Sequence, residues 1–168
     1  MHHKNKKRTT LIDTDKEFML KAIEMAQKGM DTNEGGPFGA IVVKNGKIVG
    51  RGNNKVTSTN DPTAHAEIIA IRDACKNLNT FQLDDCTIYT SCEPCPMCLG
   101  AIYWARPKRI VFACTKKDAA SVGFDDAFIY KEIELPIDKR SIKTEQQYRK
   151  EGLKVFKAWG EKQDKEKY

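Results

Sequence analysis

Hydrophobic residues in the first third of the chain change from a helical to a strand period. Residues 15–29 place apolar side chains at helical spacing, and Gly29 is a stop signal at their end. A polar, glycine-rich stretch follows. Residues 40–52 then have an apolar run, the pair Asn45-Gly46 and a second apolar run. Because an Asn-Gly pair between two such runs favours a two-residue turn, the pattern predicts a helix and then a β-hairpin.

Helical and strand periods alternate in the rest of the chain. Residues 64–78 and 94–105 have the spacing and boundary residues of helices, whereas 86–91 and 109–114 are short apolar runs typical of buried strands. The sequence is again helical in character from residue 144 onward. A hairpin supplies an antiparallel pair, and a strand–helix–strand unit supplies a right-handed parallel crossover. We therefore expect an α/β fold of three layers with a mixed sheet.

Length and composition indicate one globular domain. The chain has 168 residues, of which 40% are apolar and 31% are charged, an ordinary balance for such a domain. No stretch approaches the roughly 18 apolar residues that a membrane span needs, so no membrane partner is expected. The basic N-terminus is not followed by the apolar run of a secretory signal. These observations predict a cytoplasmic location.

The positive charge of the chain is concentrated at its N-terminus. Four of the six net positive charges come from the first eight residues, at Lys4, Lys6, Lys7 and Arg8. Residues 1–12 are therefore expected to form a disordered basic tail, and residues 13–168 the folded domain. Because the remainder has little net charge, nucleic acid is not the partner that this sequence favours.

The cysteines point to chemistry. Three of the six lie within seven residues, at Cys92, Cys95 and Cys98. In a chain without a secretion signal, such a cluster indicates metal binding or catalysis rather than a disulfide framework. The other three lie in apolar patterns and are expected to be small core residues, namely Cys75, Cys86 and Cys114.

A zinc site can be assembled from one histidine and two of these cysteines. Cys95 and Cys98 are three residues apart at the start of a predicted helix, which places both sulfur atoms on one face and favours thiolates. His65 lies at the start of the other predicted helix. These three residues offer the nitrogen and sulfur ligands that Zn²⁺ prefers. They leave one tetrahedral position free, which is typical of catalytic zinc.

Glu67 is the candidate catalytic residue beside this site. It lies two residues after His65, close enough to the free position to move protons during hydrolysis. His65-x-Glu67 followed by Pro94-Cys-x-x-Cys98 has the form of the signature of zinc-dependent nucleobase deaminases. One alternative is a structural zinc site in which Cys92 is a fourth ligand.

The residues around this motif resemble the cytidine deaminase-like superfamily. The resemblance is carried by residues 60–67 (NDPTAHAE) and 90–107 (TSCEPCPMCLGAIYWARP). It implies a three-layer α/β/α fold around a central mixed sheet of five strands. Within the superfamily, the chain resembles the bacterial guanine deaminases from about residue 15 onward. That likeness is carried by GGPFGA, QLDDC, GFDDAFIYKEI and the terminal Tyr168.

The resemblance also implies a reaction and a base pocket. The reaction is the hydrolysis of guanine to xanthine and ammonia, with one Zn²⁺ in each subunit. Phe38 is implied to stack on the purine, and the Asn54 amide and the Ala66 backbone N–H are implied to hydrogen-bond it. Asp126 is implied to accept hydrogen bonds from the N–H groups of guanine, an edge that adenine does not offer.

A homodimer is a further implication of the resemblance. The C-terminal helix, about residues 144–168, is expected to be exchanged between subunits, so that Tyr168 of one subunit caps the base pocket of the other. Two assignments in the pocket have alternatives. Asn53 could replace Asn54, and the GFDD segment could be a helix start with Asp125 as its N-cap.

Other functions are compatible with the same zinc motif. A tRNA adenosine deaminase or a cytosine deaminase would share the metal ligands and the glutamate. A protein of another class, a zinc-stabilised binding module without activity, would keep the ligands but have no use for Glu67. Activity assays with several bases distinguish the first group, and the effect of replacing Glu67 distinguishes the second.

Overall fold

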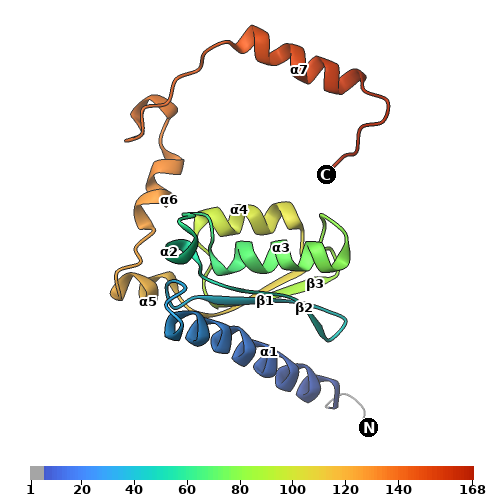
Figure 1. Ribbon diagram of the computed structural model, residues 1–168, viewed down its shortest axis with the longest axis vertical. Coiled ribbons are helices and arrows are strands. Elements are labelled where there is room, and N and C mark those ends of the chain that lie inside the picture. The colour runs from blue at the N-terminus through green and yellow to red at the C-terminus, as the bar shows by residue number, and fades with distance from the viewer. Residues whose placement is uncertain (1–5) are drawn as a thin grey trace. The chain divides into compact units, whose positions relative to one another are not determined.

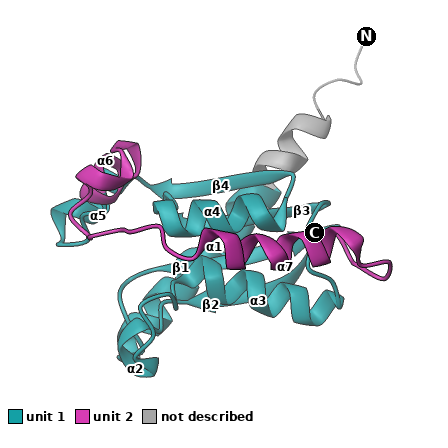
Figure 2. Cartoon of the chain, turned by 90° about the horizontal axis from the view of Figure 1, so that it is seen from above, with its two compact units in different colours: residues 1–126 teal, residues 127–168 magenta. Residues whose placement is uncertain are grey.

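The computed structural model describes the backbone of residues 6–168 and the side chains of residues 14–168 (Figure 1). Its internal contacts divide the chain into two compact units, the first ending at Asp126 and the second spanning Ala127–Tyr168 (Figure 2). All predicted site residues except Tyr168 belong to the first unit. In the described part of the chain, no helix is both long and apolar enough to cross a membrane.

The first unit is built around a mixed sheet with the strand order β2-β1-β3-β4. The hairpin strands β1 (Gly39–Lys44) and β2 (Lys47–Asn53) are antiparallel, and β1 is also antiparallel to β3 (Cys86–Cys92). The pair formed by β3 and β4 (Arg109–Cys114) is parallel. The predicted hairpin and the predicted parallel crossover are therefore both confirmed.

The sheet has four strands where five are expected from the resemblance. After β4 the chain forms helix α5 (Lys116–Ser121), and no fifth strand forms among the described residues. The local reason is a capping box. The Thr115 side chain accepts from the backbone N–H of Asp118, and the Asp118 carboxylate accepts from the backbone N–H of Thr115. This exchange begins a helix directly after the strand and leaves β4 at the edge of the sheet.

Helices cover both faces of this sheet, as the three-layer prediction requires (Figure 1). Helix α1 (Lys6–Asp31) lies on one face, and α3 (Ala66–Leu78) and α4 (Pro96–Ala105) lie on the other. A short helix, α2 (Val56–Thr59), interrupts the polar loop before α3. The predicted helices over 64–78 and 94–105 thus agree with the structure to within two residues at each end.

Alternating side chains of β3 build a core on each face of the sheet. Ile88 packs with Ala70 of α3 and Ile102 of α4. Tyr89 points to the other face and packs with Phe18 of α1. The strand is buried along its whole length, because both of its faces and both of its edges are covered.

A glycine in β2 allows α3 to approach the sheet closely. A Cβ on Gly52 would clash with the carbonyl oxygen of Ala66 and the backbone nitrogen of Ala70. The first turn of α3 is therefore packed directly against the backbone of β2, and this contact fixes the height of His65 and Glu67 above the sheet.

The second unit consists of helices joined by irregular segments. It contains α6 (Ala127–Glu134), a 3₁₀ turn (Ile137–Lys139) and α7 (Arg149–Glu161), and α7 lies in the region predicted to be helical. Residues 1–5 of the predicted basic tail lie outside the described residues, whereas residues 6–12, which were expected to be disordered, form the start of helix α1. The single domain predicted over 13–168 remains a prediction.

Candidate active site

Two helix starts meet at the predicted metal ligands. His65 is the N-cap of α3, and Cys95 is the N-cap of α4, with Pro96 in the first helical position. Neither N-cap side chain makes a capping hydrogen bond, so both can turn to a common ligand. The Sγ atoms of Cys95 and Cys98 each lie 3.5 Å from His65 Nδ1. The predicted convergence of these three residues is confirmed.

The spacing of these atoms fits a tetrahedral zinc ion. Zn–S bonds of about 2.3 Å and Zn–N bonds of about 2.0–2.1 Å, meeting at a tetrahedral angle, place sulfur and nitrogen roughly 3.6 Å apart. The candidate ligand atoms of His65, Cys95 and Cys98 all lie within 4.8 Å of one another. One nitrogen and two sulfur donors form a soft to borderline ligand set. Such a set favours zinc over calcium or magnesium, which prefer oxygen ligands.

The electrostatics of the site favour a bound cation. The Cys98 side chain and then the His65 ring, both beside the Cys95 sulfur, lower the pKa of the Cys95 thiol to about 4. The same contact with Cys95 raises the pKa of His65. Zinc binds thiolates and neutral imidazole, so a zinc ion would replace the protons that these three side chains share.

Glu67 lies beside the ligand group, in the first turn of α3, and is 6% exposed. Burial raises the pKa of its carboxyl group. The hydroxyl of Thr90 donates to Oε1 at 3.2 Å, and the thiol of Cys98 donates to Oε2 at 3.4 Å. Glu67 is not one of the three candidate ligands, which agrees with a role in proton transfer rather than in metal binding.

Cys92 is directed away from the metal ligands. Its thiol donates to the carbonyl oxygen of Thr115 at 3.5 Å, and burial raises its pKa to about 11. Cys92 is not in the group that could hold a metal, so the structure gives no support to the alternative with four protein ligands.

The prediction that Cys114 is a core residue is wrong. It is exposed, because β4 is an edge strand.

Phe38 and Asn54 are joined by a backbone hydrogen bond. The backbone N–H of Asn54 donates to the carbonyl oxygen of Phe38 at 3.0 Å. The side-chain oxygen of Asn54 accepts from the backbone N–H groups of Gly36 and Val56, both at 3.2 Å. Ala66 lies between His65 and Glu67 in sequence and is fully buried.

The side-chain nitrogen of Asn53 makes hydrogen bonds within the protein. Its Nδ2 atom donates to the Glu34 carboxylate at 2.8 Å and to the backbone oxygen of Asn54 at 3.3 Å. The oxygen of Asn54, by contrast, is fixed by backbone donors, which leaves its amide nitrogen to serve a ligand. This difference favours Asn54 over Asn53 as the residue of the base pocket.

Two residues that sequence reasoning missed support the predicted pocket. A Cβ on Gly35 would clash with the side-chain oxygen and the backbone of Asn54, so glycine is needed there. Phe124 packs edge-to-face on Phe38, with ring centroids 4.9 Å apart. The sequence signals that could have revealed them are the close-approach segment GGPFGA and the aromatic residue of GFDD.

Asp126 and Tyr168 are the remaining predicted pocket residues. Asp126 is partly buried at the end of the first unit, and burial followed by the charge of Cys95 raises its pKa. Tyr168 belongs to the second unit and is 70% exposed. The roles of both residues in substrate binding remain predictions.

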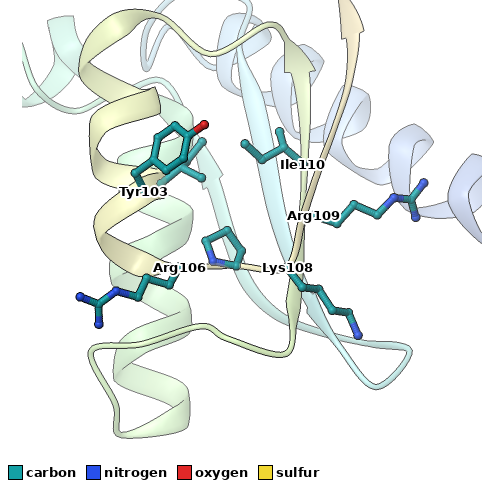
Figure 3. Close-up of a pocket in the computed structure, with 7 residues that line it drawn as sticks. Tyr103, Arg106, Lys108, Arg109 and Ile110 are labelled. Atoms are coloured by element: carbon teal, nitrogen blue, oxygen red, sulfur yellow. The ribbon is translucent and has the colours of Figure 1, made fainter.

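A separate pocket of about 390 Å³ lies at the C-terminal end of α4. In Figure 3, the ring of Tyr103 faces Ile110 of β4, whereas the side chains of Arg106, Lys108 and Arg109 point outward. None of the predicted site residues lines it. Because Cys95 is at the opposite end of the same helix, this pocket is distinct from the candidate active site.

Comparison with known proteins identifies the family of the chain. Residues 12–114 match the zinc-binding region of cytidine and deoxycytidylate deaminases. The chain is also 55% identical to the guanine deaminase of Bacillus subtilis (strain 168), over 151 residues that cover 90% of this chain and 97% of that protein. The chain belongs to the guanine deaminase family.

Solved structures support the same assignment. The X-ray structure of the Bacillus subtilis guanine deaminase matches with a TM-score of 0.89 and 54% identity, covering 91% of this chain and 98% of that one. A variant protein in complex with 8-azaguanine matches with a TM-score of 0.64 and 34% identity, covering 67% of this chain and 65% of that one.

The tRNA-specific adenosine deaminase of Aquifex aeolicus (strain VF5) is 41% identical, over 64% of this chain and 71% of that protein. The sequence similarity to the tRNA enzyme is thus limited to a part of this chain.

Proposed function

We propose that this chain catalyses the zinc-dependent hydrolysis of guanine to xanthine and ammonia. The observation that carries the proposal is the extent of the similarity to the guanine deaminase of Bacillus subtilis. That similarity covers 151 residues, whereas the zinc-binding region matches residues 12–114 only. The similarity therefore extends to residues outside the zinc-binding region. Enzymes that share a fold and a metal motif can act on different substrates, so similarity beyond the motif supports a shared substrate.

In this proposal the chain's own residues hold the metal and move the protons. His65, Cys95 and Cys98 are the ligands, and a bound zinc ion supplies a Lewis acid that makes water nucleophilic at neutral pH. The Glu67 carboxylate accepts a proton from the attacking water and delivers it to the amino group that leaves as ammonia. Its burial next to Cys98 supports this role, because bulk water is kept from the carboxylate.

In this proposal the base is held by Phe38, Asn54 and Ala66. Phe38 stacks on the purine ring, supported from its edge by Phe124. The amide nitrogen of Asn54 donates to the base, since its oxygen is held by two backbone donors. The backbone N–H of Ala66 provides a second donor.

Selectivity for guanine is assigned to Asp126. The N1–H and the 2-amino group of guanine are donors that a carboxylate can accept. Adenine presents an acceptor at N1, which would leave the carboxylate of Asp126 unpaired. Once the bound base covers this carboxylate, leaving it unpaired costs roughly 1–3 kcal/mol, so this contact favours guanine.

A homodimer with exchanged C-terminal segments, about residues 144–168, completes the proposal. Within the second unit, α7 carries large apolar side chains that are exposed, at Leu153, Phe156 and Trp159. Their spacing of three residues places them along one side of the helix, which favours burial against another surface. Tyr168 of one subunit would then contact the base in the other. We also propose a cytoplasmic location.

Ammonia release measured with a set of substrates tests this function. The purified protein is given guanine, adenine, cytosine, cytidine and a tRNA stem-loop that contains adenosine. We expect ammonia from guanine and an absorbance change to that of xanthine. The tRNA alternative has its own support in the 41% identity to an adenosine deaminase. Activity on the stem-loop alone would replace our proposal with that one.

Gly35→Ala tests the position of Asn54. The added methyl group would displace the Asn54 side chain, because a Cβ at Gly35 clashes with that residue. We expect the KM for guanine to rise about tenfold or more, as for the loss of one hydrogen bond of roughly 1.5 kcal/mol, with zinc content unchanged. Gly100→Ala is the matched control, since a Cβ there meets nothing within 4 Å. Equal KM values for both variants would remove Asn54 from the pocket.

Deletion of Tyr168 tests the exchanged C-terminus. We expect a higher KM or a lower kcat on guanine, because the base loses its cap, while zinc content stays at one ion per chain. Mixing this variant with a Glu67→Gln variant separates contributions within a subunit from those between subunits. If subunits exchange their ends, mixed dimers regain activity. Unchanged guanine kinetics in the deletion variant would rule the cap out.

A further inference from the structure

We propose that Thr90 is a positioning residue whose hydroxyl holds the Glu67 carboxylate in the orientation needed for proton transfer. This inference rests on the proposed role of Glu67 and goes beyond it, because Thr90 belongs to neither half of the zinc motif. The observation behind it is the hydrogen bond from Thr90 Oγ1 to Glu67 Oε1, at 3.2 Å between two buried side chains.

Thr90 is buried in the central part of the sheet. It is 1% exposed and lies in β3, where its backbone pairs with Ala40 of β1 on one side and Phe112 of β4 on the other. Its side chain shares the face of Ile88, which is the face covered by α3 and α4. A β-branched side chain has a restricted χ1 angle, so the hydroxyl of Thr90 is held in place by its own strand.

Binding of zinc increases the importance of this hydrogen bond. Without a metal, the thiol of Cys98 donates to the second oxygen of Glu67. A zinc ligand is a thiolate, which has no proton to donate. The Thr90 hydroxyl is then the side-chain donor that the structure provides to Glu67. A hydroxyl can donate to a carboxylate or accept from a carboxylic acid, so it holds the orientation during proton transfer.

A purely structural threonine and a positioning threonine respond differently to two substitutions. Thr90→Val keeps the shape of the side chain and removes the hydroxyl, whereas Thr90→Ser keeps the hydroxyl and removes the methyl group. A structural role in packing makes serine the more harmful change. A positioning role makes valine the more harmful change, and it affects kcat rather than KM.

The test compares these variants with a matched control on the same strand. Thr87→Val changes a buried threonine on the opposite face of β3, away from Glu67. We expect Thr90→Val to lower kcat on guanine by roughly 10- to 100-fold, as for misplacement of a catalytic group, with KM changed less than threefold. Thr90→Ser should regain most of kcat, and all three variants should bind one zinc ion per chain.

Crystal structures of the wild-type protein and of Thr90→Val give a second readout that does not depend on activity. We expect the Glu67 carboxylate to change its side-chain rotamer in the valine variant. Equal kcat in wild type and Thr90→Val, or an equal loss in Thr90→Ser, would overturn the inference. If the wild type releases no ammonia from guanine, the proposed function fails. The Glu67 rotamer in the two crystal structures then decides the positioning role by itself.

Discussion

Replacing Glu67 by glutamine is expected to lower guanine turnover by roughly two to four orders of magnitude, the usual loss for a general acid–base residue. Glutamine keeps the shape of the side chain, and its amide oxygen can still accept from Thr90. It cannot take the proton of the attacking water. The measurement is ammonia release from guanine in the variant and in the wild type, with zinc content determined on the same samples.

The zinc content makes this result specific. Glu67 is not among the three candidate ligands, so the variant should retain one zinc ion per chain and a cooperative unfolding transition. Unchanged turnover would remove Glu67 from the mechanism and favour a binding module without catalysis. Loss of zinc together with turnover would instead make Glu67 a ligand.

Cys95→Ala should abolish both zinc binding and turnover, whereas Cys92→Ala should leave one zinc ion per chain. The sulfur of Cys95 is 3.5 Å from His65 Nδ1, as a shared tetrahedral ion requires. The sulfur of Cys92 instead donates to the carbonyl oxygen of Thr115. Elemental analysis of the two purified variants measures the difference directly.

The Cys92→Ala variant is a close control, because Cys92 and Cys95 are both cysteines and are only three residues apart. Removing a buried thiol from β3 costs some stability, so the unfolding temperature of Cys92→Ala is expected to fall while its metal content does not. Zinc retained in Cys95→Ala and lost in Cys92→Ala would reverse our ligand assignment.

Local sequence signals were sufficient for most of the fold. The pair Asn45-Gly46 adopts positive φ angles of 51° and 72°, which those two residue types tolerate, and the hairpin follows. The two site helices begin directly after their N-caps, His65 and Cys95, within two residues of the starts predicted at residues 64 and 94. The spacing of Cys95 and Cys98 at the start of α4 was therefore also predictable.

Contacts between distant segments could not be derived in this way. The hydrogen bond between Thr90 and Glu67 joins residues that are 23 positions apart, and it depends on the register of β3 below α3. The edge position of β4, which exposes Cys114, depends on the absence of a fifth strand in the described residues. The local sequence around Thr90 does not indicate its contact with Glu67, and the local sequence around Cys114 does not indicate its exposure.

Titration of the metal-free protein with Zn²⁺, with guanine turnover measured at each step, tests whether catalysis depends on one bound zinc ion. The proposed mechanism predicts that xanthine and ammonia form in proportion to bound zinc and reach a plateau at one ion per chain. Full turnover by protein that contains no metal would contradict it, and so would one bound zinc per chain without any conversion of guanine.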